Sequence, residues 1–167
     1  TCARAGLPIP FWPYALEYFC LCYNVQKDFW QKRFGYAFTA PLIPFGSEVR
    51  YMPPPESRVK RAKTAERMDV GVYLGFVSHA GGLTGVDSFV CPLSELAGLN
   101  MKTGKRPDGF PPVVERADGN EIWRNQLDPA CAVFPGEGDE YVFPLKEAYD
   151  RAKNTVKSVD LGTESKD

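Results

Sequence analysis

The chain has 167 residues, 44% of them apolar and 13% aromatic, so it can bury a hydrophobic core and is not disordered throughout. Its 20 Lys and Arg residues nearly balance its 21 Asp and Glu residues, and the net charge of −1 excludes attraction to nucleic acid by bulk charge. Fifteen Gly and fifteen Pro residues predict turns and short elements.

Two helices are predicted at the start of the chain. Residues Thr1–Leu7 have the pattern of a helix end, because Gly6 suits a residue that terminates a helix. A second helix is predicted over Trp12–Tyr23, with a proline in its first turn, where the missing N–H is harmless. Its residues are apolar on nearly every face except at Glu17, so we expect a buried core helix.

An aromatic connector follows over Lys27–Ala40. Packing against the core is the expected role of its rings, since aromatic side chains mostly contribute buried area. Stacking on nucleic-acid bases is the alternative. The rings belong to Phe29, Trp30, Phe34, Tyr36 and Phe38.

Three strands are predicted in the middle of the chain. Pro41–Tyr51 ends in an alternating apolar pattern, and its Gly46 indicates a bulge or tight bend. Val70–Val77 is rich in β-branched and aromatic residues, and Val86–Cys91 is expected to return beside it as a hairpin. Between the first and second strands, Glu56–Arg67 is polar and basic, which predicts a solvated loop or a short helix.

The remainder is predicted to be irregular until a final helix. Asn100–Pro112 is rich in Gly and Pro and indicates a loop, and Glu121–Trp123 and Tyr141–Phe143 are candidates for short strands. From Leu145 an amphipathic helix is expected. Its charged residues Lys146 and Asp150, and likewise Glu147 and Arg151, are spaced to pair at i,i+4. The tail from Lys157 to Asp167 is polar.

Cysteine usage and hydropathy predict an intracellular protein of the cytoplasm or nucleus that is neither secreted nor membrane-bound. Five Cys residues form no CxxC pair, which favours free thiols in a reducing compartment. No secretory leader is recognised. The longest apolar stretch, Phe11–Tyr23, is shorter than the roughly 20 residues that cross a bilayer.

No set of catalytic or metal-binding residues is recognised in the sequence. The single histidine, His79, is expected in a solvated turn, although a hydrolase that uses Cys91 with His79 is retained as a third hypothesis. Cys20 and Cys22 would point about 200° apart on a helix and are not expected to share a metal. Six carboxylates, considered as ligands of divalent metal ions, are interpreted as surface charges: Asp28, Glu48, Asp69, Asp87, Glu95 and Glu121.

Charge is unevenly distributed along the chain. Between residues 50 and 67 six basic residues face two acidic ones, a local balance of +4, whereas residues 128 to 167 have a balance of −4. Basic side chains contact phosphates without reading sequence, so this basic strip is the candidate nucleic-acid contact, with a solvated loop as the alternative. It comprises Arg50, Arg58, Lys60, Arg61, Lys63 and Arg67.

Three motifs in this order resemble the region that follows the catalytic core of copia-type retroelement integrases. They are AGLPIPFWPYA from Ala5 to Ala15 with Asn24 after it, PFGSEVRYMPP before the basic strip, and VGVYLGF from residue 70. The longer form PLIPFGSEVRY is most similar to the retrotransposon-derived Pol proteins of dinoflagellates. Phe76 departs from the family's usual Tyr, and the region after Leu93 has no counterpart in the motifs.

The resemblance implies an α+β fold in which a buried helix precedes a small antiparallel, SH3-like β-barrel, with loops and an amphipathic helix after it. Residues 1–40 would be the remnant of the core's closing helices and the connector, and residues 41–98 the barrel. Residues 99–144 would be a loop-rich extension, and residues 145–167 the final helix and tail.

The resemblance also implies a function in DNA integration. The chain would be a non-catalytic part of a Pol polyprotein that binds and positions DNA, with other integrase subunits as further partners. No cofactor is expected in it, because the divalent metal belongs to a catalytic core whose acidic motif is absent. The alternative is a non-enzymatic β-barrel that holds protein partners through exposed aromatic residues such as Trp30, Phe34 and Tyr36.

Overall fold

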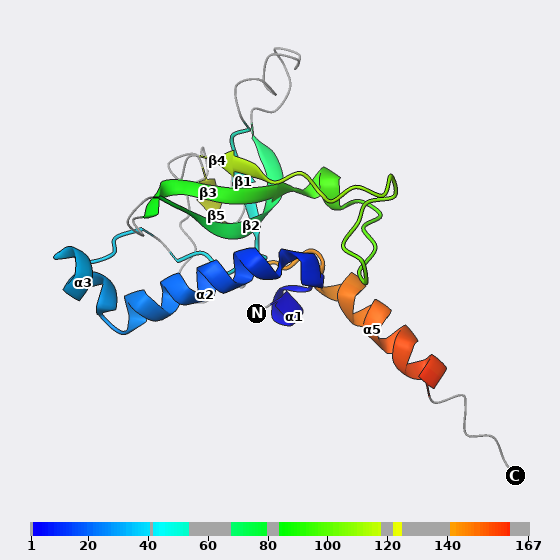
Figure 1. The fold of residues 1–167 in the computed structure, drawn as a ribbon. Coiled ribbons are helices and arrows are strands. Elements are labelled where there is room, and N and C mark those ends of the chain that lie inside the picture. The colour runs from blue at the N-terminus through cyan, green and yellow to red at the C-terminus, as the bar shows by residue number, and fades with distance from the viewer. Residues whose placement is uncertain are drawn as a thin grey trace, which may run out of the picture.

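The centre of the fold is an antiparallel sheet of five strands in the order β4-β3-β2-β1-β5 (Figure 1). The computed structural model describes residues 2–40, 42–53, 68–79, 84–117, 122–124 and 141–160. The strands are β1 (Glu48–Tyr51), β2 (Asp69–Ser78), β3 (Thr84–Pro92), β4 (Glu115–Ala117) and β5 (Ile122–Arg124). Helices pack around this sheet, so the α+β class is confirmed. Among the described residues no pairing joins β4 to β5, and the sheet is open.

The strongest local pattern of the sequence forms the centre of the sheet. β2 and β3 pair as the expected hairpin, with Val72 opposite Cys91. Val72, Tyr73 and Leu74 are all buried although successive side chains of a strand point to opposite faces, so both faces of β2 are covered here. At Gly75 the backbone φ is +113°, and the register with β3 shifts. This bulge lets α2 approach closely, because a Cβ at Gly75 would lie 3.3 Å from the Tyr18 Cβ.

The predicted first strand is shorter than its pattern suggested. Val49 and Tyr51 are buried and alternate with less buried neighbours, as expected, but β1 begins only at Glu48. The preceding residues form the predicted tight bend, where Gly46 has a φ of +82° and donates its N–H to the Tyr73 carbonyl at 2.7 Å. The bend therefore joins this segment to β2 before β1 begins.

Four helices and two short 3-10 helices complete the described fold. The helices are α1 (Cys2–Ala5), α2 (Trp12–Gln26), α3 (Phe29–Phe34) and α5 (Lys146–Asp160); the 3-10 helices are Ile9–Phe11 and Leu93–Leu96. Gly6, at a φ of +75°, ends α1 as predicted. α2 lies along one face of the sheet and packs on β2, with α1 near its start and α3 beyond its end (Figure 1).

The expectation that the second helix is buried on nearly every face is wrong. Only one side of α2 faces the sheet, where Ala15 and Tyr18 are buried and the Tyr18 hydroxyl donates to the Ile43 carbonyl. Several large apolar residues on its other side are exposed. Sequence alone suggested burial because both sides of this helix are apolar, and an all-apolar helix usually lies inside a core.

The second half of the chain departs from the sequence prediction in two places. β4 was not predicted, yet it pairs with β3 through Val90 and Glu115. Tyr141–Phe143 is not a strand, although its middle residue accepts a hydrogen bond from the Glu48 N–H at 2.8 Å. The loop over Asn100–Pro112 and a short strand near Glu121–Trp123 are confirmed.

The final helix and its charge pairs are as expected. Lys146 lies 3.0 Å from Asp150, and Arg151 lies 3.6 Å from Glu147. Leu145, just before α5, is buried in the main core.

Candidate functional site

The most unusual surface of the molecule is the side of α2 that faces away from the sheet. Four large apolar residues follow one another along it: Trp12 (55% exposed), Leu16 (47%), Phe19 (57%) and Tyr23 (48%). Their spacing of four, three and four residues places them on a single face of the helix. We call these four residues the α2 stripe.

Aromatic contacts extend the α2 stripe beyond the helix. The rings of Phe19 and Tyr23 stack with centroids 6.5 Å apart, and Tyr23 lies 6.0 Å from Phe29 of α3. Ile9 is 80% exposed one turn before Trp12. Six large exposed apolar side chains therefore lie on neighbouring elements, whereas isolated exposed apolar residues are the usual case on a protein surface.

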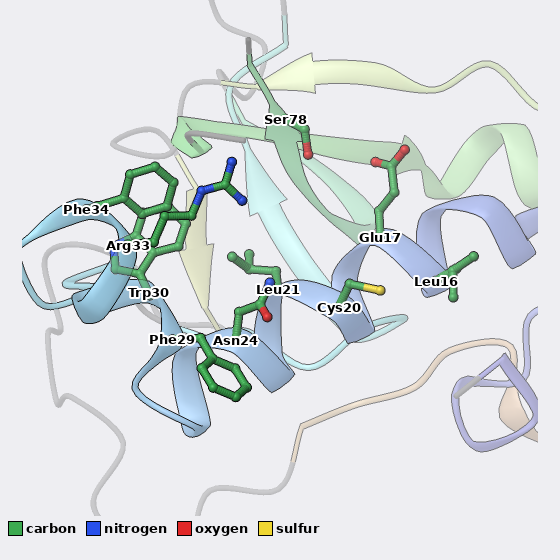
Figure 2. A pocket seen from close by; sticks show the side chains of 10 residues that line it. All are labelled: Leu16, Glu17, Cys20, Leu21, Asn24, Phe29, Trp30, Arg33, Phe34 and Ser78. Carbon is green, nitrogen blue, oxygen red and sulfur yellow. The ribbon is translucent and has the colours of Figure 1, made fainter. Parts of the chain in front are cut away.

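A groove adjoins the α2 stripe between α2, α3 and the end of β2 (Figure 2). Its volume is about 510 Å³, and Leu16 belongs both to it and to the stripe. Figure 2 shows Glu17 on the α2 side and Arg33 on the α3 side of an otherwise largely apolar lining. The lining consists of Leu16, Glu17, Cys20, Leu21, Asn24, Phe29, Trp30, Arg33, Phe34 and Ser78.

The aromatic connector both supports the groove and contributes to its surface. Trp30 is buried, its ring lies 4.4 Å from Phe34 and 5.1 Å from Phe38, and Phe38 in turn lies 5.6 Å from Phe76 of β2. The predicted packing role is therefore confirmed for Trp30. Tyr36 remains 53% exposed. The connector is therefore buried at Trp30 and exposed to solvent at Tyr36.

The arrangement does not support the Cys91 and His79 hydrolase. Cys91 pairs with Val72 in the sheet, and His79 lies seven residues further along at the exposed end of β2. At about 3.3 Å per residue this separates them by about 20 Å, far beyond hydrogen-bond reach. Burial raises the pKa of the Cys91 thiol to about 12, which opposes formation of the nucleophilic thiolate.

The acidic residues do not converge on a metal-binding geometry in the described part of the chain. No group of three or more His, Cys, Asp or Glu residues is placed there to hold a metal ion. Two of the carboxylates pair with arginines instead: Glu95 with Arg106, and Asp87 with Arg116 at 3.2 Å. Glu121 lies outside the described residues.

The basic strip is only partly represented in the structure. Arg50 is half-buried in β1, opposite Val70 on one side and Trp123 on the other. The other five residues, Arg58, Lys60, Arg61, Lys63 and Arg67, lie outside the described residues. The strands that flank the strip in sequence, β1 before it and β2 after it, end and begin at the same end of the sheet, because Tyr51 pairs with Asp69. Its role in binding nucleic acid stays a prediction.

Sequence reasoning missed the α2 stripe, although a signal for it was present. Residues 12, 16, 19 and 23 follow the alternating three- and four-residue spacing of a helix that packs against another helix. The same helix also carries an apolar side that packs on the sheet, and composition cannot separate the two sides. The structure separates them because Tyr18 and Ala15 define the covered side.

Comparison of the chain with models of known protein families, with curated proteins and with solved structures finds no match. Within the described residues, every helix is too short or too polar to traverse a bilayer.

Proposed function

We propose that this chain is a non-catalytic protein-interaction module, and that a helix of a partner docks on the α2 stripe and the adjoining groove. The observation that carries the proposal is the row of exposed residues Trp12, Leu16, Phe19 and Tyr23 on one face of a helix whose other side packs on the sheet. Large exposed apolar patches mark interaction sites more often than they mark plain surface.

A helix is the partner element that fits this spacing. Side chains that recur at alternating three and four residues are the a and d positions of a helix–helix seam, and each inserts between residues of the facing helix. Leu16 lies both in the stripe and on the wall of the groove, so a docked helix would cover the stripe while one of its side chains enters the groove.

The charge of α2 favours a protein partner over a lipid surface. Helices that lie on membranes carry Lys and Arg beside their apolar face. Glu17 is the only charged residue between Trp12 and Gln26, and it is acidic. α2 itself therefore lacks the basic flank that holds such helices on anionic membranes, and the neighbouring cation Lys32 lies on α3, over the Phe29 ring at 5.8 Å.

A charge placed in the stripe is expected to abolish helix docking. The probe is a fluorescent synthetic amphipathic peptide with Leu at every a and d position, titrated with wild-type protein. Phe19→Glu is expected to weaken binding at least tenfold, because it removes an apolar contact worth about 1.5–3 kcal/mol and leaves a buried charge. Phe110→Glu is the matched control, since Phe110 is 65% exposed and lies in the loop over Asn100–Pro112, outside α2 and α3. Equal binding by both variants would refute the proposal.

The strand order supports the proposal that the sheet is an SH3-like unit. β1 to β4 follow one another across the sheet and β5 returns beside β1, which is the order such a unit requires. The register shift at Gly75 allows β2 to bend, as a strand shared by two halves of a small barrel must. β4 and β5 come from the segment over residues 99–144, so this sheet extends beyond residue 98.

A second candidate function is the positioning of nucleic acid, in keeping with the resemblance to integrase-derived proteins. It is favoured by the basic strip, which begins with Arg50 in β1 and continues in the sequence from Arg58 onward. Phosphate contacts by the strip would hold a duplex at the end of the sheet where β1 ends and β2 begins.

Neutralising the basic strip is expected to reduce the salt dependence of duplex binding. Replacing Lys60, Arg61 and Lys63 by Ala is expected to lower the slope of log affinity against log salt by up to about 2.7, at about 0.9 per phosphate contact. The control replaces Lys102, Lys105 and Lys153, which are exposed elsewhere, and removes the same charge. If the two triple variants bind duplex DNA identically at every salt concentration, the strip is not the contact.

A further inference from the structure

The α2 stripe has a symmetry that permits pairing with a copy of itself. Its residues lie at positions 12, 16, 19 and 23, so the pattern is the same in both directions about a point midway between residues 17 and 18. We infer that the helix that docks on the stripe is α2 of a second copy of this chain, paired antiparallel about a twofold axis. This inference rests on the proposed function and names the partner of the same surface.

The antiparallel arrangement gives each stripe residue a defined neighbour. With the axis at the midpoint, Trp12 faces Tyr23 of the second copy, and Leu16 faces Phe19 of the second copy. Each contact then occurs twice, which is the requirement of an isologous dimer that closes on itself. The stripe spans 11 residue steps, or about 16 Å of helix. This length holds two successive pairs of a and d residues.

Like charges do not oppose this pairing. The positions that flank a helix–helix seam usually carry charges that select the partner. In α2 they are Pro13 and Cys20 on one side and Ala15 and Cys22 on the other, all uncharged. Glu17 lines the groove, away from the stripe. A copy of the same helix therefore meets no repulsion along its length.

The exposed apolar area is sufficient for a dimer. The four stripe residues are about half exposed, and Ile9 and Phe29 extend the surface at either end. At about 150–250 Å² for a whole large side chain, these six contribute on the order of 500–800 Å² per copy. A standard interface buries about 800 Å² per partner, and the largest apolar patch of an ordinary monomer is about 300–600 Å².

Sedimentation equilibrium with matched variants tests the pairing and its direction. The wild-type chain is expected to reach twice its mass of 18.6 kDa as concentration rises. Phe19→Glu and Leu16→Lys are each expected to weaken the dimer at least a hundredfold, and Phe110→Glu is expected to leave it unchanged. Combining Leu16→Lys with Phe19→Glu is expected to recover at least tenfold of the loss, since only antiparallel pairing brings residue 16 opposite residue 19. Circular dichroism checks that each variant is folded.

Cys20 provides an independent measurement of the proximity of the two copies of α2. It is exposed on α2 and lies about 4 Å along the helix from the midpoint, so the two copies of Cys20 lie near each other across the axis in the antiparallel pair. A short bismaleimide is expected to link two chains through Cys20, and Cys20→Ser is expected to abolish this product. A crosslink that persists in Phe19→Glu at the same yield would overturn the pairing.

Other outcomes separate this inference from the proposed function. A wild-type chain that stays at 18.6 kDa up to high micromolar concentration overturns self-pairing. If the synthetic peptide still binds that monomer and requires Phe19, the docking function stands with a different partner. If instead the monomer binds phosphatidylserine vesicles and Phe19→Glu prevents it, both proposals fail and the stripe is a lipid-binding surface.

Discussion

Raising the pH from about 9 to about 11.5 is expected to unfold the protein, because burial disfavours the ionisation of three tyrosines in the folded state. Tyr18, Tyr51 and Tyr73 are almost inaccessible to solvent, and burial raises the pKa of each phenol well above its usual value of about 10. The Tyr51 hydroxyl also donates a hydrogen bond of 2.7 Å to the Glu115 carboxylate, and a phenolate there would face a negative charge.

The direction of the effect follows from proton linkage. Below about pH 10 the phenols are neutral in both states, so they leave stability unchanged. Above it, unfolded tyrosines release protons that the folded state retains, and stability falls by about 1.4 kcal/mol per pH unit for each group. Cys91 adds the same slope from about pH 8.5, since burial raises its pKa to about 12. These losses add, and the stability of a typical domain is only about 5–15 kcal/mol, so their sum is a large part of it.

Phenolate absorbance and far-ultraviolet circular dichroism, followed together during an alkaline titration, measure this transition. The buried tyrosines are expected to ionise in one cooperative step that coincides with loss of secondary structure. Tyr51→Phe is expected to reduce the slope of stability against pH by the contribution of one phenol, about 1.4 kcal/mol per pH unit. Substitution of an exposed tyrosine, Tyr36→Phe, is expected to leave the slope unchanged. Reversible ionisation of all tyrosines near pH 10 with the fold intact would contradict the prediction.

Gly46→Ala is expected to destabilise the fold by about 3 kcal/mol or more. Gly46 has a φ of +82°, and a Cβ there would lie 2.2 Å from the Cβ of Ala5, which is itself buried. Relieving that collision requires the start of the chain to move away from β2, and the hydrogen bond from the Gly46 N–H to the Tyr73 carbonyl holds the bend in place. The cost therefore combines backbone strain with loss of core packing.

Gly35→Ala is the matched control for this substitution. Gly35 has a similar φ of +78°, but no atom outside its neighbours lies within 4 Å of the position its Cβ would take. It is expected to cost about 1 kcal/mol, from the left-handed backbone alone. Urea denaturation of the two variants gives the difference in the free energy of unfolding. Equal losses would show that the close approach of Ala5 to Gly46 is unimportant.

Sequence reasoning recovered the elements whose signals are local. The β-branched run and turn residues around Val70–Val77 predicted the central hairpin, and Gly46 predicted the bend before β1. β4 was missed because three residues, Glu115–Ala117, carry no periodicity that a short window can detect. Its existence depends on pairing with β3, a contact between segments distant in the chain.

The candidate site shows the same division. By itself the sequence determined that residues 12 to 23 form an apolar helix. The period of 3.6 residues also places positions 12, 16, 19 and 23 on one face, a signal that the sequence interpretation did not use. Only the tertiary structure decided which side is covered: β2 and the Ile43 carbonyl hold Tyr18, and this leaves Trp12, Leu16, Phe19 and Tyr23 outward. Burial is a property of what lies opposite a side chain, and a helix with two apolar sides does not encode locally which one the sheet will cover.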